Sequence, residues 1–146
     1  MPTINNVFSS DGLLAGAIKG FVPREAQTEM AKAVKRAIDT TGSLIVEAGT
    51  GTGKTFAYLA PALLSDGKAI VSTGTKNLQE QLFHRDLPLV KKALGSKRKT
   101  ALLKGRANYL CLHRLAQHGG NSTLVEKEVL GQLSEVKRWS STTKTG

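Results

Sequence analysis

The chain has 146 residues, of which 40% are hydrophobic and 22% are charged, and this balance argues for one folded domain rather than a disordered protein. Lysine and arginine number 21 against 11 aspartate and glutamate residues, so the formal net charge is +10. Such an excess favours a polyanionic partner, nucleic acid above all, and a merely soluble basic surface is the alternative.

The sequence contains one cysteine, Cys111, which excludes an internal disulfide and favours a reducing compartment. The apolar stretch Leu13–Ile18 is too short for a membrane span or for the core of a signal peptide. We therefore expect a cytoplasmic protein that has no membrane partner.

The first 22 residues contain three glycines and little periodicity, which predicts an irregular lead-in with at most one helical turn. Pro23 then opens an amphipathic helix that ends at Thr40–Gly42. The apolar face of this helix is expected to comprise Ala26, Met30, Ala33, Val34, Ala37 and Ile38.

A glycine-rich stretch, Glu47–Thr55, lies between the apolar run Leu44–Val46, which reads as a strand, and a helix expected from Lys54 to about Ser65. Pro61 should kink or shorten that helix. Glycines in such a turn let backbone N–H groups converge on an anion, and the helix adds the positive end of its dipole. The stretch therefore predicts a phosphate cradle.

Two side chains of this stretch have the chemistry of a nucleotide site. Lys54 is placed to bridge the β- and γ-phosphates, and the Thr55 hydroxyl is placed to bind the Mg²⁺ that accompanies a nucleotide. The match to G-x-x-x-x-G-K-[ST] departs at its first glycine, where Ala48 stands. A flexible linker with an incidental lysine is the alternative interpretation.

The chain then continues to alternate between apolar runs and helical patterns. Ala69–Ser72 and Thr100–Leu103 read as strands, a helix begins at Lys76, and Pro88 begins or interrupts the next helix. Short apolar strands that alternate with helices predict an α/β fold with a parallel sheet covered on both faces.

Beyond Gly105 the sequence predicts helices only. One surrounds Leu110–Leu115, and Gly119–Asn121 ends it. Thr123 and Glu126 form a capping box for a second helix that carries Val125, Val129, Leu133 and Val136.

Two polar groups flank the phosphate cradle in the sequence. Upstream, Phe21, Arg24 and Gln27 suit an adenine ring, although a glutamine on a helix face is more often only solvated. Downstream, the hydroxyl, amide and ammonium groups of Ser72–Leu82 suit the phosphates of a nucleic-acid strand. An ordinary helix cap by Thr75 explains part of the same pattern.

Four blocks of the sequence, in this order, resemble those of superfamily 2 DNA helicases of the iron–sulfur, XPD-like type, and most of all the DinG/YoaA branch: Phe21–Gln27, Glu47–Thr55, Val71–Leu82 and Leu103–Cys111. The resemblance implies a RecA-like P-loop NTPase core with a parallel sheet, cut at the start of the iron–sulfur insertion. The expected parts are a lead-in (1–22), a partial ATP-binding motor domain 1 (23–104) and an incomplete cluster insertion (105–146).

The resemblance also implies roles for individual residues. Gln27 would read adenine, and catalysis would rest on Lys54 and Thr55. The ATP-binding set would be Arg24, Gln27, Ala48, Gly49, Thr50, Gly51, Thr52, Gly53, Lys54 and Thr55. The residues against single-stranded DNA would be Thr73, Thr75, Lys76, Asn77 and Gln79. Cys111 would be the first of four cysteines that hold a [4Fe–4S] cluster in the full-length parent.

The implied parent is an ATP- and Mg²⁺-dependent helicase that moves 5′ to 3′ on single-stranded or forked DNA. The chain departs from the pattern, because it has one cysteine and no adjacent pair of acidic residues to hold Mg²⁺ and activate water. We therefore expect an N-terminal fragment that does not hydrolyse ATP at a useful rate alone. Without the resemblance, Cys111 would be interpreted as a small buried hydrophobic residue.

Two other functions are open on these observations. A non-catalytic nucleic-acid-binding module would have a vestigial phosphate loop, and a small P-loop kinase would need arginines, for which Lys97–Lys99 is the candidate cluster. The basic run between Lys91 and Arg106 is expected to flank a DNA path or to form a solvated surface.

Overall fold

The computed structural model describes residues 2–118 and 127–143. The chain divides into two compact units, residues 1–100 and 101–146. The first unit includes residues 1–22, the expected lead-in. Over the described ranges, no helix is long and apolar enough to cross a membrane.

The lead-in is more ordered than its glycines indicate, because it folds into α1 (Ile4–Phe8) and α2 (Leu13–Ala17). The Thr3 hydroxyl caps α1 by accepting a hydrogen bond of 3.3 Å from the Asn6 N–H. The side chains of α1 and α2 then enter the core of the first unit: Ile4, Val7, Phe8 and Leu14. Burial of these apolar side chains holds helices that are too short to be stable alone.

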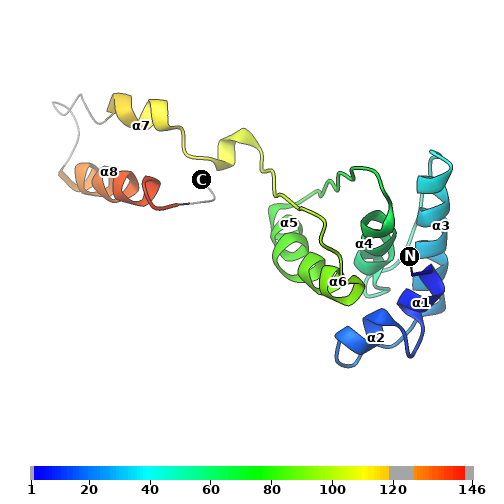
Figure 1. Ribbon diagram of the computed structural model, residues 1–146. Coiled ribbons are helices and arrows are strands. Elements are labelled where there is room, and N and C mark those ends of the chain that lie inside the picture. Colours follow the sequence, from blue (N-terminus) through cyan, green and yellow to red (C-terminus); the bar gives the residue numbers. More distant parts are fainter. Residues whose placement is uncertain (1, 119–126, 144–146) are drawn as a thin grey trace. The chain divides into compact units, whose positions relative to one another are not determined.

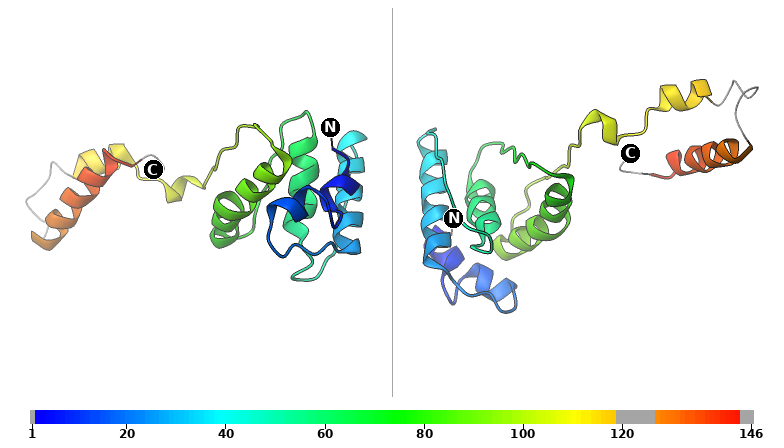
Figure 2. Two further views of the ribbon diagram at one scale, coloured as in Figure 1. Left: turned by 60° about the horizontal axis from the view of Figure 1, so that its bottom comes forward. Right: turned by 180° about the vertical axis from the view of Figure 1, so that it is seen from behind.

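The long helix α3 (Glu25–Asp39) lies along α4 (Lys54–Leu64), as the views in Figures 1 and 2 agree. The sequence predicted α3, but its buried positions are Gln27 and Ala31, whereas Ile38 is exposed. Pro61 does not shorten α4, which continues beyond it and buries the proline ring in the core.

A continuous helical run follows the extended residues 68–73. It consists of α5 (Lys76–Gln81), the π-helical turn η1 (Leu82–Asp86) and α6 (Leu87–Leu94). Pro88 lies inside this run, at the start of α6, directly after the π-helical turn, in which the Leu87 N–H donates to the Leu82 carbonyl. α6 packs against α2 and α4 and closes the core of the first unit (Figure 1).

The parallel sheet expected from the sequence is not formed in the described residues. The runs at 44–46, 69–72 and 100–103 are extended, but none pairs with a neighbour. Ile45 is 99% exposed and Ile70 is 96% exposed. A strand exists only by hydrogen bonding to another strand, so an apolar extended pattern without adjacent partners cannot become one.

The second unit contains η2 (Arg106–Asn108), α7 (Leu112–His118) and α8 (Lys127–Ser140). Both α-helices were predicted from the sequence. The predicted break at residues 119–121 and the capping box of Thr123 and Glu126 lie outside the described residues. Within this unit, the Tyr109 hydroxyl accepts a hydrogen bond of 2.8 Å from the Lys104 N–H.

Candidate phosphate-binding site

The glycine-rich loop has the backbone geometry of an anion site. Gly51 has φ of 78° and Gly53 has φ of 80°, both in the left-handed region that favours glycine. Gly53 is the N-cap of α4, and no side chain caps this helix. Because the first N–H groups of a helix lack acceptors within it, the start of α4 is available to an anion.

Lys54 lies folded over the loop that precedes it. Its Nζ donates hydrogen bonds of 2.7 Å to the Ala48 carbonyl and 2.6 Å to the Gly49 carbonyl. The Thr52 hydroxyl also donates to the Gly49 carbonyl, at 2.9 Å. The ammonium group is therefore held at the mouth of the loop, where it can exchange carbonyl oxygens for phosphate oxygens.

Gln27 connects α3 to this loop across 26 positions of sequence. Its side chain is buried, and its Nε2 donates a hydrogen bond of 3.0 Å to the Gly53 carbonyl. Among the described side chains, Gln27 Oε1 is a buried acceptor without a hydrogen-bond donor. Burying an acceptor in this way is unfavourable, and a ligand amino group would satisfy it.

The other two members of the predicted adenine group lie nearby in sequence but differ in exposure. Phe21 packs partly against the hydrophobic core, and Arg24 is the exposed N-cap residue of α3. The structure thus brings Gln27 into contact with the loop, whereas the Arg24 side chain is exposed.

Thr55, the predicted Mg²⁺ ligand, has a neighbour that the sequence did not point to. Tyr58 follows it on α4, three positions later. Burial raises the pKa of Tyr58, the hydrogen bond with Thr55 opposes this shift, and the negative charge of Asp86 adds to it. The phenol therefore stays protonated at neutral pH. The spacing of a threonine and a tyrosine three positions apart on a helix was the available signal.

The predicted DNA segment begins at the start of α5. The Thr75 hydroxyl accepts a hydrogen bond of 3.2 Å from the Leu78 N–H, which confirms the ordinary capping role. The Thr73 hydroxyl donates to the Thr75 carbonyl at 3.3 Å. Lys76 and Asn77 are exposed, and Gln79 is half-buried.

A groove of about 910 Å³ opens beside this segment, between α3, α4 and residues 65–74. Ile38, Tyr58 and Val71 are among the residues that line it. None of residues 47–55 belongs to its lining. The phosphate loop therefore lies outside this groove.

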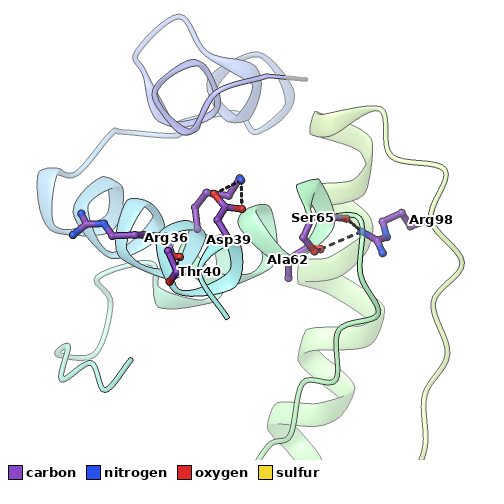
Figure 3. A network of polar contacts seen from close by, with 7 residues as sticks. Arg36, Asp39, Thr40, Ala62, Ser65 and Arg98 are labelled. Atoms are coloured by element: carbon purple, nitrogen blue, oxygen red, sulfur yellow. Dashed lines mark hydrogen bonds and ion pairs between the residues drawn. The ribbon is translucent and has the colours of Figure 1, made fainter. Parts of the chain in front are cut away.

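The basic run is partly occupied by contacts within the first unit. Arg98 donates to the carbonyls of Ala62, at 3.4 Å, and Ser65 (Figure 3). It also donates to the carbonyls of Asp66, at 3.5 Å, and Gly67. Lys91 Nζ donates to the Arg98 carbonyl at 2.6 Å. Arg98 thus closes the C-terminal end of α4, and this contact limits its availability to DNA.

Cys111 is exposed, which contradicts its interpretation as a buried hydrophobic residue. It directly precedes α7, whose first residue, Leu112, is itself 65% exposed. The described residues contain no group of three or more side chains that suit a metal ion. A [4Fe–4S] cluster needs several thiolates, and the residues of this chain alone do not fit one.

Comparisons with known proteins agree with the loop chemistry. The ATP-dependent DNA helicase YoaA of Haemophilus influenzae is 61% identical over 143 residues, which cover 98% of this chain and 22% of that protein. YoaA of Escherichia coli is 53% identical over 139 residues, which cover 95% of this chain and 22% of that protein. The ATP-dependent helicase DinG of Mycobacterium tuberculosis is 48% identical over 110 residues, which cover 70% of this chain and 17% of that protein.

The chain thus spans about 22% of the length of the two YoaA proteins. No solved structure matches it. The family model for DEAD/DEAH box helicases matches residues 24–142, which include the phosphate loop and the start of α5. The chain therefore belongs to the DEAD/DEAH box helicase family, whose motor domains have a RecA-like fold.

Proposed function

We propose that this chain forms the phosphate-binding part of an ATP-dependent DNA helicase motor of the YoaA and DinG type. The observation that carries the proposal is the loop before α4, where two left-handed glycines, an uncapped helix start and the Lys54 ammonium converge. The names of the related proteins supply the rest, because both YoaA and DinG are described as ATP-dependent helicases.

Each residue of the site has a defined task in this proposal. Lys54 releases the Ala48 and Gly49 carbonyls and binds the β- and γ-phosphates. Thr55 holds Mg²⁺, which when bound neutralises charge on the phosphate oxygens. Gln27 keeps its hydrogen bond to Gly53 and accepts one from the adenine amino group through its unpaired Oε1.

Two finer features also belong to the proposal. The extended residues 44–46 and 69–72 are strands of a parallel RecA-like sheet when neighbouring strands are present. The exposed start of α5, with Lys76, and the preceding half-buried Thr73 contact the phosphates of single-stranded or forked DNA. Cys111 as the first cluster ligand stays a prediction, and no further ligand accompanies it in this chain.

Nucleotide binding tests the central claim. A fluorescent ADP analogue titrated with the 146-residue chain in Mg²⁺ should show saturable binding. Lys54→Ala removes charge-assisted hydrogen bonds, so affinity should fall by about 10- to 100-fold. Lys19→Ala makes the same charge change at an exposed turn and should leave the affinity unchanged. Equal affinities for all three proteins would rule out the phosphate site.

DNA binding tests the role of α5 separately. The affinity for single-stranded DNA should fall steeply with salt, because each neutralised phosphate releases counterions. Lys76→Ala should reduce the slope of log affinity against log salt by about 0.7. Steep salt dependence with an unchanged slope in Lys76→Ala, and no nucleotide binding, would favour a DNA-binding module that uses another face.

A further inference from the structure

The basic run between Lys91 and Arg106 contains side chains that contact the protein and side chains that face solvent. The sequence has no aspartate or glutamate between Asp86 and Glu126, so nearby acidic residues along the chain do not balance the charge of this run. The part of the run from Lys91 to Lys99, which we call the lysine turn, begins on α6 and belongs to the first unit. Its basic side chains fall into two groups that differ in their contacts.

The backbone of the lysine turn is fixed by a helix-ending motif. Gly95 has φ of 61°, in the left-handed region that favours glycine. The Ser96 N–H donates to the Lys91 carbonyl at 2.9 Å, and the Gly95 N–H donates to the Lys92 carbonyl at 3.2 Å. This pair of hydrogen bonds is that of a Schellman motif, which ends α6 and sets the direction of the chain that follows.

Lys91 and Arg98 fasten the turn to the rest of the first unit. Lys91 Nζ donates to the Arg98 carbonyl at 2.6 Å, and the Arg98 N–H donates to Ser96 Oγ at 3.4 Å. The Arg98 guanidinium donates to the carbonyls of Ala62 and Ser65 at the end of α4. These two basic side chains are therefore used inside the protein, and they tie the turn to α4.

The remaining basic side chains of the turn are exposed, and we call them the outer lysines: Lys92, Lys97 and Lys99. Within the part of the chain that the structure describes, none of the three forms a hydrogen bond or an ion pair. The contacts of Arg98 bring one acidic residue near, Asp66, and Lys68 follows it two positions later. Three ammonium groups thus stand on a backbone that is already ordered, which lowers the entropic cost of binding an anionic chain.

We propose that the outer lysines form a second contact surface for the phosphates of single-stranded DNA. Exposed ammonium groups without partners suit phosphate oxygens, whose charge they neutralise without reading the bases. Arg98 is a positioning residue that holds this surface against α4. The surface lies at the opposite end of the helical run of α5, η1 and α6 from Lys76, so the two contacts reach different phosphates. The choice of DNA as the polyanion rests on the proposed function.

Binding of fluorescent oligothymidine to the 146-residue chain, followed by anisotropy over a range of salt concentrations, tests this surface. Lys97→Ala combined with Lys99→Ala removes two phosphate contacts, so the slope of log affinity against log salt should fall by about 1.4. Adding Lys76→Ala should lower the slope by about a further 0.7. Arginine at positions 97 and 99 keeps both charges and should keep the slope of the wild-type protein.

A matched control removes the same net charge elsewhere. Lys19→Ala combined with Lys32→Ala changes an exposed lysine and one that already pairs with Glu29, and it should leave the slope unchanged. Arg98→Gln releases the turn but leaves the outer lysines, so affinity should fall by about two- to fivefold at an unchanged slope. A slope lowered by about 0.7 in Arg98→Gln would show that Arg98 itself contacts a phosphate, and would overturn its positioning role.

Circular dichroism must show the same helix content in all of these variants. An unchanged slope in the variant of Lys97 and Lys99, or an equal fall in the matched control, would overturn the lysine surface. Slopes that respond to Lys97 and Lys99 but not to Lys76 would support this surface and overturn the DNA contact proposed at α5. Nucleotide binding is measured separately, so its failure would count against the phosphate site and not against the outer lysines.

Discussion

The contact between Gln27 and Gly53 places a strict requirement on one glycine. Gly53 has a left-handed backbone, and a Cβ added there would lie 2.0 Å from Gln27 Nε2. Gly51 has nearly the same φ, but an added Cβ would meet no atom within 4 Å. A residue with a Cβ would therefore strain the backbone at either position, but only at Gly53 would it also clash with the Gln27 side chain.

This difference predicts that Gly53→Ala destabilises the chain more than Gly51→Ala. Each alanine should cost about 1–2 kcal/mol for the left-handed backbone. Gly53→Ala should cost a further 0.5–1.5 kcal/mol or so, because the Gln27 amide must move away from the Gly53 carbonyl. Urea unfolding followed by circular dichroism measures both values. In a Gln27→Ala background the extra cost should disappear, and its persistence would show that Gln27 is not the cause.

The sequence predicted the residues of the phosphate loop but not all of their partners. Lys54 and Thr55 follow from a local pattern, because the loop and the helix start lie within one short stretch. The burial of Gln27 depends on α3 lying along α4, and the burial of Asp86 depends on the packing of η1 in the same unit. Such contacts join residues far apart in the chain, and no local pattern encodes them.

At the level of elements, Arg98 shows how one side chain can fix the end of a helix. The last carbonyls of a helix lack partners within it, and a basic side chain there satisfies them. Arg98 reaches the carbonyls of Ala62 and Ser65 at the end of α4, as Figure 3 shows. This contact holds the chain after α6 against α4, although the two are distant in sequence.

Arg98→Ala should therefore lower the free energy of unfolding by about 1–3 kcal/mol, since it removes several hydrogen bonds from a charged donor. Arg98→Lys should restore only part of the loss, because an ammonium cannot reproduce the planar fork of the guanidinium. Lys97→Ala, which changes an exposed neighbour, serves as the control in the same urea titration. Equal stability of Arg98→Ala and Lys97→Ala would contradict the capping role.

The elements themselves were predicted unevenly. α3, α4 and the run from α5 to α6 follow from apolar periodicity and proline positions, which are local signals. α1 and α2 were missed because each has five residues, too few for a periodic pattern, and their stability comes from burying Phe8 and Leu14 in the core. The strands were predicted from their apolar composition, but strand formation also needs a neighbour, which the described residues do not supply.

At the scale of the whole molecule, the unpaired extended segments dominate the expected behaviour in solution. Ile45 and Ile70 are almost fully exposed, each within an apolar run that has free backbone N–H and C=O groups. Exposed apolar edges of this kind template pairing between chains. The net charge of +10 opposes such association, and salt screens that repulsion.

We therefore expect the chain to self-associate, and to do so more strongly as the salt concentration rises. Replacing Ile45 and Ile70 together by threonine keeps a β-branched side chain but removes apolar surface, so association measured by light scattering should fall. Val22→Thr removes a similar exposed apolar group outside the extended runs and should leave association unchanged. Circular dichroism must show the same helix content in all three proteins. If Val22→Thr reduced association as much as the double variant, general surface hydrophobicity rather than the unpaired edges would be the cause.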